Sequence, residues 1–262
     1  MKYFRLSKYI FLILGLLCSF SLMASDFAKE KRWADQIVDD LMVGEAEWLN
    51  LESKKFLGIY TPTSIKKSLG GVIVLHGIGI HPNWADVVQP IRSDLPDLGW
   101  HTIAIQMPIL KNEAKSEDYV PHFTGIKPRI EAAIAFLKSK GIKNIVIVAH
   151  SLGSTMGAYF MAANKDASVK AFVAVSVSAT SNKEPWYLSS LPKIKSPVLE
   201  IYGSDDLPEV INTTADKASL AKSSGIKDYK QIKVDGADHF FKGKNDELVK
   251  QIAGWIQTYA EK

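Results

Sequence analysis

Short, continuously apolar runs recur along the chain and alternate with stretches whose apolar residues return every three or four positions. A short apolar run rich in β-branched residues is typical of a strand covered on both faces, and hence of a parallel sheet. Stretches with the longer period predict helices, which in such an alternation cover both faces of the sheet. Strands are predicted at residues 70–75, 102–106, 144–148, 169–177, 197–202 and 229–234.

Two further elements precede this alternation. Residues 27–42 carry apolar side chains four positions apart between charges, which predicts an amphipathic helix lying on the domain. Residues 45–51 and 56–62 flank a polar turn and predict a hairpin at the edge of the sheet. Later helices are predicted near residues 84–98, 130–141, 212–222 and 248–259. The first of these should be kinked or split, because it contains Pro90 and Pro96.

The N-terminus has the order of features found in a secretory signal peptide. Basic residues stand at positions 2, 5 and 8, an apolar run extends from Tyr9 to Met23, and the small residue Ala24 follows. As a membrane span the run is too short, at about 15 residues against the roughly 20 needed. We therefore expect a signal peptide at residues 1–24 and a periplasmic or secreted mature chain, residues 25–262, with no stable membrane span.

Length, charge and cysteine content narrow the class of protein. The 262 residues, 47% of them hydrophobic, suffice for one domain with a sizeable core. The chain has 32 basic and 28 acidic residues, and the expected cleavage removes three basic ones, which argues against nucleic-acid binding. The single cysteine, Cys18, would be lost with the signal peptide. Disulfides, zinc thiolates and a cysteine nucleophile are therefore excluded from the mature chain.

A sharp turn, Ala149 to Gly153, follows the strand predicted at residues 144–148 and leads into a helix rich in small residues. Such a turn lifts the hydroxyl of Ser151 clear of the sheet, and its neighbours are small because strand and helix nearly touch there. The pattern departs from G-x-S-x-G at Ala149, where alanine, with its single methyl group, replaces the first glycine of the motif. Serine and glycine are common in turns, so the motif alone is weak. Its placement between a strand and a helix favours a nucleophile.

A serine nucleophile needs a base that is oriented by a carboxylate, and both occur after later strands. Asp205 and Asp206 follow one predicted strand, and His239 follows the next. Because parallel strands end at the same edge of a sheet, these side chains should converge with Ser151. Either aspartate could be the acid, since both occupy the same tight turn.

Two further stretches make a family resemblance specific. His76 and Gly77 follow an early apolar strand, and the order Ser, Asp, His on strand-end loops resembles the α/β-hydrolase superfamily over nearly the whole mature chain. HGIGIHPNW at 76–84 and GWHTIAIQMPIL at 99–110 are similar to a bacterial branch of that superfamily catalogued as a domain of unknown function. The resemblance implies one α/β-hydrolase domain, residues 25–262, with a mainly parallel twisted sheet, helices on both faces, and a small cap domain or none.

The resemblance also implies roles for single residues. Three side chains would act as nucleophile, base and acid, in that order: Ser151, His239 and Asp206. Asp206 stands three residues beyond the glycine after its strand, and Asp205 remains the alternative acid. The backbone N–H groups of Ile78 and Leu152 would form the oxyanion hole. Neither a cofactor nor a metal is implied.

The other histidines are interpreted differently. His150 is expected on the opposite side of the turn from the nucleophile, in packing or in the pocket lining. His76 is expected to form hydrogen bonds that shape the oxyanion loop. His81, His101 and His122 lack the spacing typical of metal ligands, which argues against a metal site.

Two connections, residues 107–128 and 179–195, are longer than packing requires. Both leave strand ends on the side of Ser151, so we expect them to form the walls of an open pocket.

These features together predict a secreted serine hydrolase of the esterase, lipase or thioesterase kind, which cleaves a carboxylic ester or a related acyl bond of a small molecule. A thioester or amide substrate is the nearest enzymatic alternative. The alternative from another class is a catalytically idle protein of the same fold that binds a ligand or a partner in the cell envelope. The sequence indicates no particular protein partner.

Overall fold

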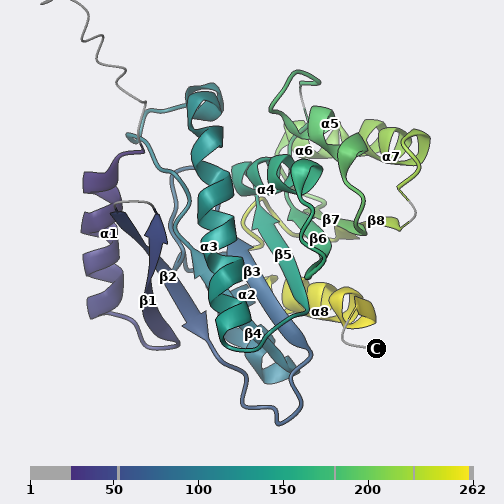
Figure 1. Ribbon diagram of the computed structural model, residues 1–262. Helices are drawn as coiled ribbons and strands as arrows, with labels where there is room; N and C mark the ends of the chain where they lie inside the picture. The colour runs from purple at the N-terminus through teal and green to yellow at the C-terminus, as the bar shows by residue number, and fades with distance from the viewer. Residues whose placement is uncertain (1–24, 52–53, 180, 227, 260–262) are drawn as a thin grey trace, which may run out of the picture.

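The computed structural model describes residues 25–51, 54–179, 181–226 and 228–259 (Figure 1). The signal peptide predicted at residues 1–24 lies outside these ranges. Within them, every helix is too short or too polar to cross a membrane.

The described strands form one eight-stranded sheet that is parallel except at one edge (Figure 1). Their order is β1-β2-β4-β3-β5-β6-β7-β8, and the β1–β2 and β2–β4 pairs are the antiparallel ones. The parallel strands are β3 Gly70–Leu75, β4 Trp100–Ile105, β5 Ile145–His150, β6 Val169–Val175, β7 Val198–Gly203 and β8 Tyr229–Val234. The antiparallel strands β1 Glu45–Leu51 and β2 Lys54–Thr61 form the edge hairpin that the sequence predicts.

Every predicted strand is confirmed, with ends displaced by two residues at most. The displacement at β6 has a local cause. This strand was expected to continue to Val177 but ends at Val175, because Ser176 has φ of 52°, outside the range of extended backbone. The chain therefore leaves the sheet at Ser176.

Helices cover both faces of the sheet, as the alternation predicts (Figure 1). Those on one face are α3 Ile126–Ser139 and α4 Leu152–Ala163, and those on the other are α2 Val88–Asp94 and α8 Asn245–Ile256. Successive side chains of β3 alternate between the two hydrophobic cores, as a strand covered on both faces requires. The mainly parallel, doubly covered sheet is the predicted fold class.

The remaining helices are shorter or lie at the edges of the sheet. They are α1 Phe27–Asp39, α5 Tyr187–Ser190, α6 Pro208–Ile211 and α7 Thr214–Ser223, with 3-10 turns η1 Leu95–Leu98, η2 Ser116–Gly125, η3 Leu191–Lys193 and η4 Gln257–Tyr259. The split expected near Pro96 is present, since α2 ends at Asp94 and η1 begins at Leu95. Pro96 has no N–H to donate to the carbonyl four residues earlier, so the α-helical hydrogen-bond pattern is interrupted there. Pro90 lies in the first turn of α2, where that N–H is not needed.

A buried ion pair fastens α1 to the rest of the domain. Arg129 of α3 donates to both carboxylate oxygens of Glu30, at 2.8 and 3.0 Å, and to the carbonyl of Gln106, at 2.8 Å. The Arg129 and Glu30 side chains are only 1% and 6% exposed. A pair this deeply buried holds α1 in one orientation, because either charge alone would be costly to bury. Gln106 directly follows β4, so the pair also anchors the start of the connection from residue 107.

The sheet order brings four loops to one place. β5, β6, β7 and β8 are consecutive neighbours and run parallel, so the segments that follow them leave the same edge. Ser151, Ser176, Asp206 and His239 lie on these four segments. Open α/β sheets bind ligands at this edge.

Candidate active site

Ser151 lies in a strained turn between β5 and α4. Its φ of 54° and ψ of −124° fall in a region that costs a non-glycine residue roughly 1–3 kcal/mol. Hydrogen bonds on both sides hold the turn: the N–H of Ser151 donates to the carbonyl of Val175 at 2.9 Å, and the N–H of Ser154 donates to the carbonyl of Ser151 at 2.9 Å. The hydroxyl of Ser154 donates to the carbonyl of Ala149 at 2.7 Å.

The small residues around the turn are there because strand and helix approach closely. A Cβ atom on Gly153 would lie 2.4 Å from the carbonyl oxygen of His76, so any other residue would push α4 away from the end of β3. Ala149 lies within β5, paired with Leu75 and Ala174, where extended backbone accepts a methyl group without strain. The departure from G-x-S-x-G therefore falls at a position that does not need glycine.

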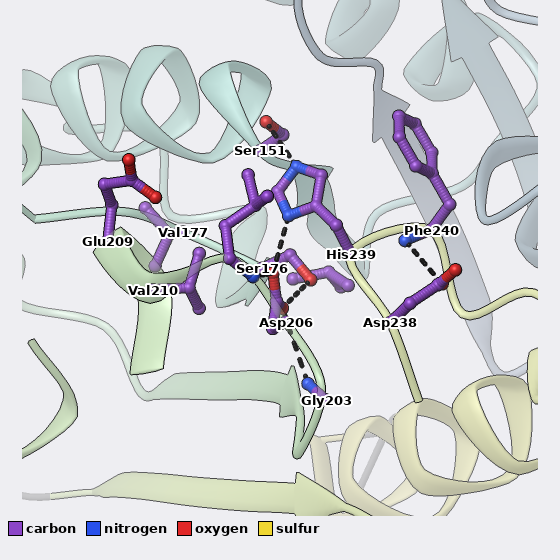
Figure 2. Close-up of polar contacts among 12 residues, drawn as sticks. Ser151, Ser176, Val177, Gly203, Asp206, Glu209, Val210, Asp238, His239 and Phe240 are labelled. Carbon is purple, nitrogen blue, oxygen red and sulfur yellow. Dashed lines mark hydrogen bonds and ion pairs between the residues drawn. The ribbon is translucent and has the colours of Figure 1, made fainter. Parts of the chain in front are cut away.

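The side chains of Ser151, His239 and Asp206 form a continuous chain of hydrogen bonds (Figure 2). His239 Nε2 is 3.0 Å from Ser151 Oγ, and His239 Nδ1 is 2.7 Å from Asp206 Oδ1. The Asp206 side chain is fully buried, and that of His239 is 14% exposed. Ser151 and Asp206, which lie 88 and 33 positions before His239 in the sequence, thus contact the two ring nitrogens of its imidazole.

Three further donors stabilise the carboxylate of Asp206. The hydroxyl of Ser176 donates to Oδ2 at 2.6 Å, and the N–H groups of Leu207 and Gly203 donate to Oδ1 at 2.7 Å and to Oδ2 at 3.4 Å. Burial by itself would raise the pKa of Asp206, but the bonds from His239 and Ser176 outweigh it and leave that pKa below its usual value. Asp206 is therefore an anion at neutral pH.

The choice between the two aspartates follows from their position in the turn. Asp205 is exposed, and its Oδ1 accepts a hydrogen bond from Ser204 at 3.1 Å. Asp206 points inward to His239. The end of β7 and the loop after β8 are packed tightly against each other at this turn. A Cβ on Gly203 would lie only 2.0 Å from the carbonyl oxygen of Ala237, so the position requires glycine.

Two side chains at this site were missed or misplaced by the sequence interpretation. Ser176 was read as part of a strand, and no local pattern marks a serine with positive φ. His150 was expected on the opposite side of the turn, but its ring centroid is 5.0 Å from that of His239. Its Nε2 donates to the carbonyl of His239 at 2.9 Å, which fixes the loop that carries this residue. His150 also lines the adjoining cavity, as expected.

His76 orients the loop after β3, in agreement with its interpretation from the sequence. Its Nε2 accepts a hydrogen bond from the N–H of Met107 at 3.0 Å, so the proton resides on Nδ1, which donates to the carbonyl of Gly77 at 2.8 Å. In a trans peptide the N–H points opposite to the carbonyl. The N–H of Ile78 is therefore turned away from His76.

The N–H groups of Ile78 and Leu152 belong to residues that line the same cavity as Ser151. Leu152 is the first residue of α4, where helical N–H groups have no partner within the helix and the helix dipole is positive. The loop after β3 lies against the nucleophile, since a Cβ on Gly77 would be 2.9 Å from Cβ of Ser151. This arrangement can surround a developing negative charge beside Ser151 with two N–H donors.

A cavity of about 740 Å³ opens beside Ser151 and His239. Both long connections supply its walls, as expected: Ser116 and Glu117 come from the first, and Ser181 and Trp186 from the second. A second cavity, of about 930 Å³, lies between α3 and the end of α4 and is lined by other residues. Among the described residues, no three His, Cys, Asp or Glu side chains are grouped as metal ligands would be.

A family described as "Protein of unknown function (DUF3530)" matches residues 26–124 and 111–258, which together span most of the sequence. The chain belongs to this family. No curated protein matches it in sequence.

Solved structures similar to this DUF3530 chain are α/β hydrolases. An esterase from Pyrococcus furiosus is 16% identical, with a TM-score of 0.67, over 83% of this chain and 91% of its own. An alpha-beta serine hydrolase homologue from Coxiella burnetii is 17% identical, with a TM-score of 0.64, over 82% and 99%. A dienelactone hydrolase from Anabaena variabilis is 20% identical, with a TM-score of 0.64, over 83% and 98%. At these identities the comparisons show the fold, and the predicted α/β-hydrolase resemblance is confirmed.

Two buried histidines predict that the DUF3530 chain loses stability in acid. Burial lowers the pKa of His76 to about 3 and that of His150 to about 4, with His239 adding to the effect at His150. An unfolded histidine titrates near 6.5. As the pH falls from about 6.5 to 4, the unfolded chain therefore binds more protons than the folded one, and the free energy of unfolding decreases. Each histidine contributes ~1.4 kcal/mol per pH unit in this window.

Urea unfolding at a series of pH values across this window measures the slope. In His150→Gln, which keeps an N–H donor for the carbonyl of His239, the slope should decrease by the share of one histidine. A free energy of unfolding that stays constant between about pH 6.5 and 4.5 would show that these histidines are not held neutral by the fold.

Proposed function

We propose that this protein is a serine hydrolase that cleaves a carboxylic ester or a related acyl bond through an acyl-enzyme on Ser151. The observation that carries the proposal is the unbroken chain from Asp206 through His239 to the hydroxyl of Ser151, with distances of 2.7 and 3.0 Å. A serine hydroxyl becomes nucleophilic when a base within hydrogen-bond reach can take its proton. The similar folds of an esterase and a dienelactone hydrolase agree with this chemistry.

In the first half-reaction Ser151 Oγ forms a bond to the carbonyl carbon while its proton passes to His239 Nε2. Asp206 accepts the hydrogen bond from Nδ1–H and stabilises the imidazolium, so the positive charge is offset where it develops. The imidazolium then donates its proton to the leaving atom as the bond between that atom and the carbonyl carbon breaks. Water repeats the sequence on the acyl-enzyme, with His239 again as base, and releases the acid.

The negative charge on the carbonyl oxygen in each tetrahedral intermediate would be bound by the N–H groups of Ile78 and Leu152. The positive end of α4 adds to this stabilisation. His76 contributes indirectly. Its hydrogen bond to the carbonyl of Gly77 orients that peptide so that the Ile78 N–H points away from His76. None of these steps needs a cofactor.

The proposal is tested by incubating the purified protein with a fluorophosphonate probe and mapping the adduct by mass spectrometry. We expect one phosphonylated residue, Ser151, and release of p-nitrophenol from short-chain p-nitrophenyl esters that the probe abolishes. An adduct on another serine would refute the assignment of the nucleophile. A folded protein that is neither labelled nor active would indicate a ligand-binding member of the fold instead.

A periplasmic or secreted location is part of the proposal. It rests on the signal-peptide pattern of residues 1–24 and on the absence of cysteine from the sequence after Cys18. Cell fractionation and the N-terminal residue of the isolated protein test it, with cleavage expected after Ala24. An intact N-terminus on cytoplasmic material would contradict the assignment.

A further inference from the structure

The cavity beside Ser151 has a polar lining for a site of this size. The hydroxyl-bearing residues Ser116, Thr155, Ser178 and Ser181 line it from three segments of the chain. Apolar lining comes from Trp186, Tyr187, Leu207 and Phe240 and from the residues around the oxyanion loop. A pocket for a long alkyl chain would present mostly aliphatic side chains.

Thr155 is the most informative of these residues. It is only 3% exposed, it lines the cavity, and its hydroxyl forms no hydrogen bond with another described residue. It lies in the first turn of α4, four residues after Ser151 in the sequence. The hydroxyl oxygen is not fully enclosed by protein atoms, so it is accessible from the cavity, where a polar group of a bound substrate would supply the missing partner.

The charged residues around the cavity all carry the same sign. Glu117 of η2 and Glu209 of α6 line it from two different walls, and both are exposed. Of the described residues that line the cavity, none is Lys or Arg. His150 is neutral near pH 7, so it does not balance the two carboxylates.

We propose that the cavity selects esters whose non-reacting part is polar and positively charged. Thr155 binds a polar group of the substrate one helical turn from Ser151, and Glu117 and Glu209 attract a cationic group while they repel an anionic one. The aromatic rings of Trp186 and Phe240 can bind an ammonium group through cation–π interactions. This inference rests on the proposed function, because it concerns the substrate of the same site.

Charge selection is measured with three acetates that differ in the charge of the alcohol: acetylcholine, its neutral isostere 3,3-dimethylbutyl acetate, and the anionic 2-sulfoethyl acetate. A second series carries the charge on the acyl side, with p-nitrophenyl 4-(trimethylammonio)butanoate, 5,5-dimethylhexanoate and 4-sulfobutanoate. In at least one series, kcat/KM for the cation should exceed that for the anion on the order of tenfold at low ionic strength. The ratio should fall with salt, since the screening length decreases from about 30 Å at 0.01 M to about 3 Å at 1 M.

Glu117→Gln and Glu209→Gln together should bring the cation-to-anion ratio close to one. Glu113→Gln is the matched control, because Glu113 is exposed on the same connection as Glu117 but does not line the cavity. This control removes the same charge from the protein and should leave the ratio unchanged. A wild-type ratio near one in both series, or a ratio that survives the double substitution, would overturn the role of the glutamates.

The role of Thr155 is measured with 2-hydroxyethyl acetate and propyl acetate, which have the same shape but differ in one polar group. Thr155→Val should lower the ratio of their kcat/KM values about five- to tenfold, the effect of one lost hydrogen bond. An unchanged ratio would overturn this contact.

Labelling of Ser151 by the neutral fluorophosphonate distinguishes a failure of the proposed hydrolase function from a failure of the proposed substrate preference. Variants that are labelled at the wild-type rate are folded and reactive, so a missing substrate preference in them counts against the inference alone. An unlabelled wild type would refute the proposed function and the inference with it.

Discussion

Replacing Ser151 by alanine is expected to lower kcat/KM for a short-chain ester on the order of a million-fold, the size of loss seen when a serine nucleophile is removed. The hydroxyl is the only group at hydrogen-bond distance from His239 Nε2 among the contacts of the described residues. Alanine at φ 54° carries much the same backbone strain as serine, so the melting temperature should change little. Steady-state kinetics with p-nitrophenyl acetate, at high enzyme concentration, measures the loss.

The double variant Ser151→Ala/His239→Ala provides the control for this prediction. If the two residues act as a unit, removing the base from a protein that already lacks the nucleophile should cost almost nothing more. Losses that multiply would indicate separate roles. Substantial turnover by Ser151→Ala, after correction for contaminating esterase, would contradict the acyl-enzyme mechanism.

Replacing Asp206 by asparagine is expected to lower kcat about ten-thousandfold while the fold is retained. The carboxylate accepts from His239 Nδ1 at 2.7 Å and so keeps Nε2 free to take the serine proton. An asparagine that turns its NH₂ group toward Nδ1 would favour the tautomer with the proton on Nε2, which cannot act as a base. Kinetics over a range of pH measures the effect, and the melting temperature shows whether the fold persists.

Asp205→Asn is the matched control, since it removes a carboxylate from the same turn. Asp205 is exposed and bonds to Ser204, so its replacement should change kcat by less than about twofold. Equal losses in the two variants would indicate that the turn itself, rather than one carboxylate, is what the reaction requires. A larger loss for Asp205→Asn would reverse the assignment of the acid.

The apolar pattern predicted the sheet well because each central strand is covered on both faces. β3 begins and ends at the predicted residues and is buried along its whole length. Where a strand ends on a functional loop the pattern was less accurate. The run that forms β6 continues as Val175-Ser176-Val177, and periodicity alone does not show that the backbone turns at Ser176.

Some residues of the candidate site could likewise be predicted from the sequence, and others could not. Ser151 could be chosen from the sequence because its turn needs small residues at nearby positions, and His239 because it follows a predicted strand in the order Ser, Asp, His. The choice of Asp206 over Asp205 depended on which of two adjacent side chains points inward. The roles of His150 and Ser176 as hydrogen-bond donors to the His239 carbonyl and to the Asp206 carboxylate depend on contacts 89 and 30 residues apart.

By itself the sequence determined the alternation of strands and helices, the strained turn at Ser151 and the order in which the reactive side chains follow their strands. These properties are local, because burial and backbone geometry restrict the residue types within a few positions. Only the tertiary structure decided which aspartate faces His239, which groups hold the imidazole, and that Thr155, Glu117 and Glu209 share a cavity with Ser151. The physical reason is that hydrogen bonds and charge act over a few ångströms in space, and the packing of β5 to β8 brings these distant residues within that range.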